Sequence, residues 1–516
     1  MTKKLLKSTA LVSSMTFISR IMGLVRDMVI AHIFGASAAM DAFWVAFRIP
    51  NFMRRLFAEG SFSQAFVPVL AKYKECHTHE EVQSFVAGMM GTLGTILLLL
   101  TIVVELATPL VVMIFAPGYL RDPYRFHQAS SMLRMTFPYL FLISMTAFAG
   151  SLLNTYNKFA VPAFTPVLLN FAMIGAALLL APYLPQPVHA LAWGVFLAGV
   201  LQLLFQIPFL KQLKLMVRPR IQWRHPGVIR VLKLMVPALF GVSVAQISVL
   251  VDTLFASFLP IGSVSWLYYS DRLTSFPLGI FGVAIATVVL PHLSSHKAKE
   301  DIAEFSHIID WGLRMVLLIG IPAGLGLLVL SGPLLSSFYL SGAFSVRDVI
   351  MANKSMMMFA IGVPAFMMVK ILAAGFYANQ DIKTPVKCAA IAMGCNVLIN
   401  MALIIPLRHA GLALSTSLSS TLNAILLAIF LYRRGIWHLD PHWRKYGLQL
   451  LMANVAMVVF LFWLSPALST WMHWHRGLRV EMLLALVFGS MAVYLVTLRL
   501  AGLEFRQFLS ARKPNP

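Results

Sequence analysis

The sequence predicts an all-α polytopic membrane protein with fourteen transmembrane helices. The first observation is the composition: 59% of the 516 residues are hydrophobic and only 12% are charged, whereas soluble domains carry about 25% charged residues. The second is the length of the apolar runs, most of which match the roughly 20 residues that a helix needs to cross a bilayer. The third is the placing of Lys and Arg in alternate loops. The formal net charge of +22 therefore indicates membrane topology rather than nucleic-acid binding.

Apolar runs between polar or Pro/Gly-rich breaks define the expected spans. The first two runs carry the most charge. The fourteen ranges are 9–33, 41–71, 83–116, 127–155, 160–181, 188–210, 231–257, 265–295, 305–331, 350–377, 385–405, 411–431, 446–465 and 480–498.

The basic residues of the loops predict the orientation. The loops and tail on the side of the N-terminus hold 24 Lys and Arg, and the opposite loops hold 6. Because positive charge is retained in the cytoplasm, this bias predicts a multi-pass protein of the bacterial inner membrane with both termini cytoplasmic. The richest loop, 211–230, fits either a topology signal or a segment that lies on an anionic leaflet.

Eleven of the 41 basic residues lie within the spans or at their ends. A cation at the bilayer centre costs about 2.5–3.5 kcal/mol even on insertion scales. Five of them crowd into the first two spans together with three acids, namely Arg20, Arg26, Arg48, Arg54 and Arg55 with Asp27, Asp41 and Glu59. Two interpretations stay open. The charges form salt bridges between helices, or they line a water-filled cavity whose surplus positive charge awaits an anionic substrate.

A weak internal repeat favours a transporter over a scaffold. Pro138 and Asn170 recur as Pro364 and Asn396, both at a shift of 226 residues. A shift of six spans gives the two halves the same orientation, with an axis along the membrane normal. The expected parts are an N-terminal lobe at 1–225, a C-terminal lobe at 226–435, and a segment at 436–516 that holds the last two spans and a cytoplasmic tail.

A second polar cluster belongs to the C-terminal half of the chain. Asp252 is expected in the middle of span seven, Asn396 and Asn400 share one face of span eleven, and Thr416 begins span twelve. Carboxylate, amide and hydroxyl oxygens suit Na⁺ or a proton. Hydrogen bonding between helices is the alternative explanation.

The sequence contains no nucleotide-binding loop, zinc-protease motif or nucleophile elbow, so we expect neither an enzyme nor a bound cofactor. Cys76, His77 and His79 have the residue types of a metal site, but they lie in a short polar loop and we expect no metal there.

Long motifs of this chain resemble the MurJ/MviN family of lipid II flippases, which belongs to the multidrug/oligosaccharidyl-lipid/polysaccharide exporter superfamily. The resemblance covers nearly the whole chain. The matching stretches are 19–27 (SRIMGLVRD), 41–43 (DAF) with 50–60 (PNFMRRLFAEG), 62–68 (FSQAFVP), 265–273 (SWLYYSDRL) and 375–387 (GFYANQDIKTPVK).

The resemblance implies two six-helix lobes in a V around a central cavity, with two C-terminal helices forming a lipid-facing groove. It implies transport of lipid II, an undecaprenyl-pyrophosphate-linked peptidoglycan precursor, by a protein that works as a monomer. Substrate-binding residues carried over are Arg20, Arg26, Asp41, Arg54 and Arg272, to which the charge pattern adds Asp27 and Arg48. The same resemblance carries a cation site onto Asp252, Asn396, Asn400 and Thr416.

Two other transport functions stay open, a flippase for another polyprenyl-linked glycan and a cation-coupled multidrug exporter of the same fold. An exporter of cationic drugs should have an acidic or aromatic cavity, so the arginines count against it. The two extra helices suit a prenyl tail, which could lie along small apolar residues such as Ala453, Gly489 and Ala492, or those residues could simply let the helices pack closely.

Overall fold

The computed structural model describes residues 3–56, 62–282, 285, 289, 293, 302–438 and 442–504. Within these residues the regular structure is helical and there is no β-strand beyond one isolated bridge between Ser341 and Phe344. Ten described helices are long and apolar enough to cross a membrane. The prediction of an all-α polytopic membrane protein is confirmed. The ten helices correspond to predicted spans three to six and nine to fourteen, and the total of fourteen stays a prediction.

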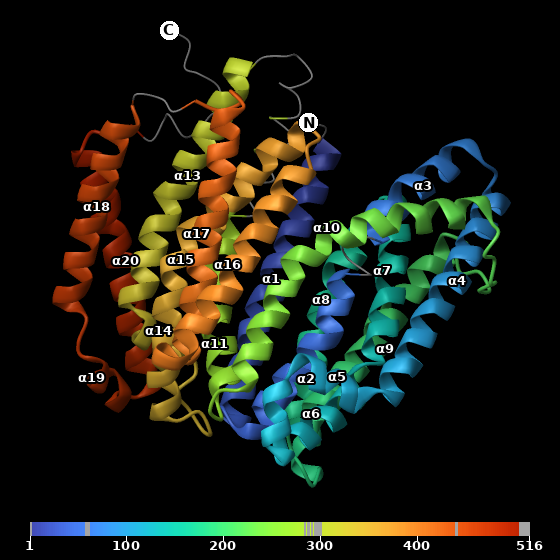
Figure 1. Cartoon of the computed structure of the whole chain (residues 1–516), viewed down its shortest axis with the longest axis horizontal. Helices are drawn as coiled ribbons and strands as arrows, with labels where there is room; N and C mark the ends of the chain where they lie inside the picture. The colour runs from blue at the N-terminus through green and yellow to red at the C-terminus, as the bar shows by residue number, and fades with distance from the viewer. Residues whose placement is uncertain are drawn as a thin grey trace. The chain divides into compact units, whose positions relative to one another are not determined.

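The chain divides into two compact units, residues 1–265 and 266–516. The helices of the first unit, coloured blue to green in Figure 1, are α1 (Lys3–Phe34), α2 (Ala38–Arg54), α3 (Ser63–Cys76), α4 (His79–Leu106), α5 (Thr108–Phe115), α6 (Pro123–Thr136), α7 (Tyr139–Thr155), α8 (Ala160–Gly175), α9 (His189–Gln212) and α10 (Pro226–Ser257), with the short turn η2 (Pro117–Arg121) between α5 and α6.

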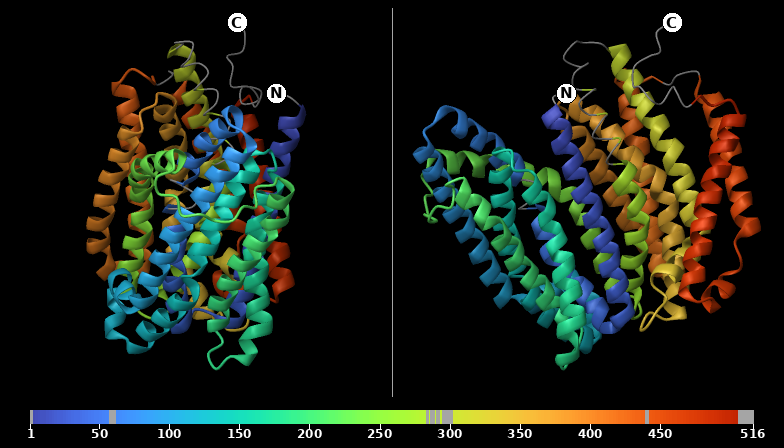
Figure 2. Two further views of the ribbon diagram at one scale, coloured as in Figure 1. Left: turned by 90° about the vertical axis from the view of Figure 1, so that its right-hand side faces the viewer. Right: turned by 180° about the vertical axis from the view of Figure 1, so that it is seen from behind.

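The helices of the second unit are α11 (Ser263–Pro277), which starts at the end of the first unit, α13 (Ile302–Val329), α14 (Ser331–Phe338), α15 (Val346–Ala378), α16 (Lys383–Leu407), α17 (His409–Arg433), α18 (Trp443–Leu464), α19 (Leu468–His473) and α20 (Arg476–Leu500). Helices α18 and α20 pack on each other, and α18 also packs on α13 (Figures 1 and 2).

Several predicted spans are interrupted in ways that hydropathy does not show. Predicted span 83–116 breaks at Ala107 into α4 and α5, and span 127–155 turns at Phe137 and Pro138 between α6 and α7. Proline cannot donate the backbone hydrogen bond that continues a helix. Predicted span 41–71 ends its first helix at Arg54, and residues 57–61 lie outside the described part.

The repeat predicted from the sequence is visible in the order and length of the elements. Helices α4 and α13 each contain 28 residues, and α5 and α14 each contain 8. Four helices of the first unit, α4, α5, α6 and α8, begin 223 residues before α13, α14, α15 and α16 respectively. The two halves therefore repeat the same layout of helices. The predicted lobe boundary between residues 225 and 226 stays a prediction. In the structure α10, which follows that boundary, packs on helices of the first unit.

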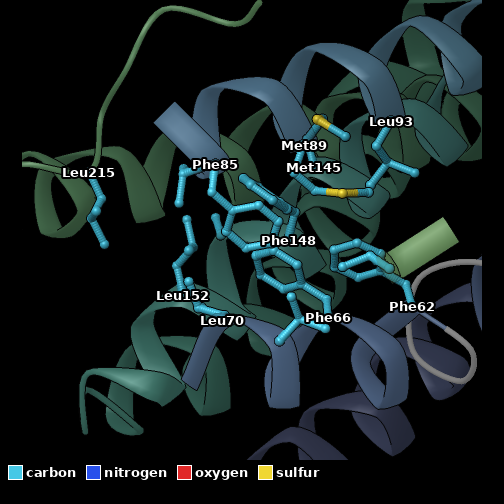
Figure 3. Packing of buried hydrophobic residues seen from close by; sticks show 14 of the residues in the cluster. Phe62, Phe66, Leu70, Phe85, Met89, Leu93, Met145, Phe148, Leu152 and Leu215 are labelled. Atoms are coloured by element: carbon cyan, nitrogen blue, oxygen red, sulfur yellow. The ribbon is translucent and has the colours of Figure 1, made fainter. Parts of the chain in front are cut away.

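The core of the first unit is a cluster of aromatic and aliphatic side chains between α3, α4, α7 and α10 (Figure 3). Phe66 lies at its centre, with its ring centroid 5.1 Å from that of Phe148 and 5.7 Å from that of Phe85. Leu215, from the segment between α9 and α10, is also buried in this cluster. The aromatic contacts fix α3 and α4 against α7.

Candidate functional site: buried charges of the first unit

The most deeply buried ion pair of the described residues lies on α1. Arg26 is 6% exposed and Asp27 is fully buried. The Nε and Nη2 atoms of Arg26 donate to Oδ1 of Asp27 at 2.9 and 2.6 Å. Its Nη1 donates to Oδ1 of Asn170 on α8 at 3.2 Å. An arginine held by both a carboxylate and an amide has a fixed orientation, which a flexible side chain in water lacks.

Asn170 joins α8 to α1 through both ends of its amide group. While its oxygen accepts from Arg26, its Nδ2 donates to the backbone oxygen of Ser19 at 3.1 Å. Sequence analysis noted Asn170 only as a member of the repeat, and the structure shows its role in positioning the guanidinium. Arg20 lies half-buried on the same helix, one residue after Ser19.

Asp41, at the start of α2, is bonded to the turn between α10 and α11. Its carboxylate is fully buried and accepts from the backbone N–H of Gly262 at 2.7 Å and of Ser265 at 2.9 Å. The Ser265 hydroxyl donates to it at 2.7 Å. The first N–H groups of a helix have no acceptor within that helix. At the start of α11 the Asp41 carboxylate, from another part of the chain, is their acceptor. The predicted substrate residue thus acts as a helix cap in this conformation.

A second set of bonds holds the same turn, and sequence analysis missed it. Arg125 on α6 donates to Oδ2 of Asp122 at 2.6 Å and to the backbone oxygen of Leu259 at 3.2 Å. Its guanidinium lies 4.8 Å from the ring centroid of the buried Tyr119. Burial works to raise the pKa of the Asp122 carboxyl, but hydrogen bonds from the Arg125 backbone and side chain outweigh it and the pKa lies below its usual value. In the sequence Arg125 looks like an ordinary basic residue of a loop. Only the pair Asp122-Pro123 before it, which is typical of a helix start, indicated regular structure there.

Helix α2 carries the remaining predicted substrate-binding arginines of the first unit. Arg48 donates through Nη1 to the hydroxyl of Thr253 on α10 at 2.7 Å. Arg54 donates to Oδ1 of Asn51, one turn earlier on α2, at 3.3 Å. Both side chains are partly exposed. Glu59, the predicted third acid, lies outside the described residues.

The second unit holds Arg272 and three members of the predicted cation set. Arg272 is half-buried on α11. Asn396 and Asn400 are buried on α16, where Nδ2 of Asn400 donates to Oδ1 of Asn396 at 3.1 Å. Asn396 in turn donates to the Ser415 hydroxyl on α17 at 3.1 Å, and that hydroxyl donates back to the Asn396 backbone oxygen at 2.9 Å.

The other two members of the predicted cation set are Thr416 on α17 and Asp252 on α10. Thr416 donates its hydroxyl to the backbone oxygen of Leu412 on its own helix at 3.0 Å. Asp252 is half-buried on α10 in the first unit. The structure therefore brings Asn396 and Asn400 together with serines of α17, a neutral network of the kind that holds helices together in membranes.

The polar groups of the first unit suit anion binding. Their chemistry is that of guanidinium groups oriented by carboxylates and amides, and a guanidinium binds phosphate oxygens two at a time. Among the described residues no group of three or more His, Cys, Asp or Glu is arranged to hold a metal ion. The same is true of the described loop with Cys76, His77 and His79.

The small residues of the last two helices serve close packing where they meet. Ala453 and Met457 of α18 are buried. A Cβ added to Gly489 of α20 would lie 2.8 Å from the Phe460 ring, so this glycine admits the ring. Ala485 and Ala492 are exposed on the outer face of α20. The contact between Gly489 and Phe460 favours the interpretation that small residues let α18 and α20 pack closely. A prenyl tail would have to lie on the exposed face of α20.

Comparison with known proteins gives a consistent result over the whole chain. The family model described as lipid II flippase MurJ matches residues 30–483. A probable lipid II flippase MurJ from Haemophilus influenzae is 46% identical over 509 residues, covering 96% of this chain and all of the relative. A lipid II flippase MurJ from Burkholderia cenocepacia is 41% identical, covering 98% of this chain and 99% of the relative.

Solved structures agree with the sequences. The structure of a lipid II flippase MurJ in an inward closed conformation superposes with a TM-score of 0.81 at 26% identity, covering 97% of this chain and all of that one. An inward-facing multidrug resistance transporter of the MATE family gives a TM-score of 0.68 at 12% identity over 83% of this chain and 98% of that one. The second similarity shows a shared fold alone.

Proposed function

The chain belongs to the lipid II flippase MurJ family, and from that premise we propose that it flips lipid II from the cytoplasmic to the periplasmic leaflet of the inner membrane. It is a multi-pass membrane transporter and not an enzyme. The observation that carries the proposal is the match of nearly the entire chain to relatives that bear this name, at 46% and 41% identity. A match of that extent includes the charged helices α1 and α2 as well as the apolar spans.

In the proposed mechanism, arginines bind the pyrophosphate of the substrate. Those of the first unit are Arg20, Arg26, Arg48 and Arg54, and Arg272 belongs to the second. Asp27 orients Arg26, because it accepts two hydrogen bonds from that guanidinium. A pyrophosphate carries about two negative charges and fits the paired N–H groups of arginine. The prenyl tail stays in the lipid, where it costs nothing to bury.

Asp41, one of the proposed substrate-binding residues, also has a proposed role in the conformational cycle. Its three hydrogen bonds, with those of Arg125 and Ser257, fix the turn between α10 and α11 to α2, η2 and α6. Alternating access requires such contacts to form in one state and to break in another. We assign this turn to the periplasmic side, since both termini are proposed to be cytoplasmic.

Cation coupling and subunit number are further parts of the proposal. Asp252 offers a carboxylate, and Asn396, Asn400 and Thr416 offer oxygen atoms that suit Na⁺, or the carboxylate alone could carry a proton. In this conformation the Asn396 oxygen accepts from Asn400, so a cation would have to replace that bond. We propose that one chain is sufficient for transport.

The decisive experiment measures flipping by the purified protein in vesicles that contain lipid II, with and without an imposed membrane potential. A rate that depends on the protein and is lost in the Arg26→Ala variant supports the proposal. Two further substrates test the alternatives, a polyprenyl-pyrophosphate with a different glycan and a cationic dye. Equal flipping of both polyprenyl lipids would mean that the protein recognises the polyprenyl-pyrophosphate anchor and not the glycan. Transport of the dye without lipid II movement would identify a drug exporter and would refute the proposal.

A further inference from the structure

The segment between α9 and α10, residues 213–225, crosses the surface of α4 as an extended strap. Three hydrogen bonds fix its backbone there. Gln83 of α4 donates to the backbone oxygen of Lys214 at 2.6 Å, the Arg220 N–H donates to the backbone oxygen of Ala87 at 3.0 Å, and the Gln222 N–H donates to the Thr92 hydroxyl at 3.2 Å. Figure 1 shows this segment in green beside α4.

Two glycines of α4 make room for the strap. A Cβ added to Gly91 would lie 2.2 Å from the backbone oxygen of Arg220, and one added to Gly88 would lie 2.6 Å from Oε1 of Gln222. Gly94, one turn further along, has only side-chain neighbours at 3.9 Å or more. The helix surface is therefore shaped for the strap at Gly88 and Gly91 and not beyond.

Side chains of the strap point to two sides. Leu215 is buried in the aromatic core of the first unit and Val217 packs against it (Figure 3). The outward side combines large apolar groups with cations. Met216 is 47% exposed, Ile221 60% and Trp223 49%, and the exposed basic residues among and beside them are Lys211, Lys214, Arg218, Arg220 and Arg224. No acidic residue interrupts the sequence 211–230.

The residue types of the outward side suit the edge of the bilayer. Tryptophan and arginine are the residues that favour the boundary between headgroups and hydrocarbon, where the aliphatic part of arginine stays apolar and its guanidinium reaches the phosphates.

We propose that this strap is a docking surface for anionic phospholipids, in which Met216, Ile221 and Trp223 insert among the acyl chains while Arg218, Arg220 and Arg224 bind headgroup phosphates. Charge complementarity selects the anionic lipid, because a zwitterionic headgroup would satisfy only the apolar half of the surface. Fixing the backbone on α4 beforehand lowers the conformational entropy that lipid binding would otherwise cost. The inference concerns a different surface from the substrate site and does not depend on which lipid is flipped.

The test uses the full chain in detergent with a fluorescent label on cysteine at position 221, after Cys76→Ser and Cys395→Ser. Short-chain phosphatidylglycerol and short-chain phosphatidylcholine are titrated separately, and the blue shift of the label gives the midpoint. We expect a lower midpoint for phosphatidylglycerol. Each arginine near an anionic surface strengthens attraction by about five-fold, so the combined Arg218→Gln, Arg220→Gln and Arg224→Gln variant should raise that midpoint by more than about ten-fold and leave the phosphatidylcholine midpoint unchanged.

Two controls separate the strap from charge in general and from folding. Lys72, Lys383 and Lys387 are exposed basic residues elsewhere, and replacing all three with Gln removes the same charge. Equal weakening by both triple variants would overturn the proposal, as would an unchanged midpoint in the arginine variant, which would leave an acidic protein as the partner for this surface.

Gly91→Ala should displace the strap and weaken phosphatidylglycerol binding with all arginines present, whereas Gly94→Ala should not. An effect of Gly94→Ala as large as that of Gly91→Ala would assign the loss to helix disruption and would also overturn it.

Discussion

Asn170 and Asn396 lie on the repeat-related helices α8 and α16, 226 residues apart in the sequence, and yet they hold different structures together. On α8, Asn170 accepts from Arg26, whose other nitrogen atoms bind the buried Asp27. On α16, Asn396 belongs to a neutral network with Asn400 and Ser415. An amide can donate and accept at once, so it satisfies either a guanidinium or a hydroxyl without changing the helix layout.

The difference teaches how repeat-related helices can hold a buried charge in one half and neutral polar groups in the other. A buried cation is costly in a membrane unless a carboxylate and further hydrogen bonds accompany it. The first unit supplies both for Arg26, whereas the corresponding region of the second unit needs no charge to hold α16 to α17. Repeated architecture therefore says little about repeated chemistry, and the chemistry must be identified from the side-chain contacts of each half.

The largest effect should come from breaking the ion pair on one side. Arg26→Ala leaves the Asp27 carboxylate buried without its main partner, which costs about 3–5 kcal/mol. We expect loss of flipping together with a clearly lower thermal unfolding temperature in detergent. The combined Arg26→Gln and Asp27→Asn variant removes both charges and should recover most of the stability, while flipping stays lost. Wild-type flipping by the double variant would show that the pair is structural and binds no substrate.

The network around Asn396 offers the next test, with an effect on stability and on the ion response. Asn396→Leu leaves the Ser415 hydroxyl without its amide donor and removes the acceptor of Asn400, at a cost of about 1–3 kcal/mol. The unfolding temperature should fall, and because Asn396 belongs to the proposed cation set, the dependence of flipping on Na⁺ should weaken in the folded protein. Ser417, which donates to the Met358 backbone oxygen between α17 and α15, provides a matched control in Ser417→Ala, which should lower the unfolding temperature alone. An ion response equal to wild type in Asn396→Leu would leave the network with a packing role only.

Much of this arrangement could be predicted, and the remainder depended on contacts between distant segments. Long apolar runs were sufficient for the ten confirmed spans, because length and hydropathy are local properties. The break at Ala107 was missed because the apolar run is long on both sides, although Glu105 and Pro109 stand beside it. Similarly, neighbouring charges such as Arg26 and Asp27 were visible in the sequence, but their link to Asn170 requires α1 to pack on α8. Arg125 gave no periodic signal, because its partners are a loop backbone and a residue three positions away.

A smaller effect is expected where only one bond of the charged site is lost. Asn170→Ala removes the 3.2 Å bond to Arg26 and the 3.1 Å bond to the Ser19 backbone, and leaves the ion pair intact. A neutral hydrogen bond contributes about 0.5–1.5 kcal/mol, so stability should fall slightly. Flipping should slow several-fold because Arg26 loses its orientation, and the apparent affinity for lipid II should fall with it. Unaltered kinetics would mean that Asp27 alone orients the guanidinium.

The smallest effect on stability, and the sharpest for mechanism, concerns Asp252. This residue is half-buried on α10, next to Thr253, which accepts a hydrogen bond from Arg48. Asp252→Asn keeps the size of the side chain and removes a carboxylate that could bind Na⁺ or a proton. If Asp252 couples transport to a cation, the variant should lose most of the dependence of flipping on Na⁺ or pH while its affinity for lipid II changes little.

Asp271→Asn is the matched control, because Asp271 is an exposed carboxylate on α11 outside the proposed cation set. An ion response equal to wild type in Asp252→Asn, or an equal loss in both variants, would remove Asp252 from the coupling site. The charges of the first unit would then be assigned to the substrate, and the neutral oxygens of Asn396, Asn400 and Thr416 would be the remaining candidates for a cation.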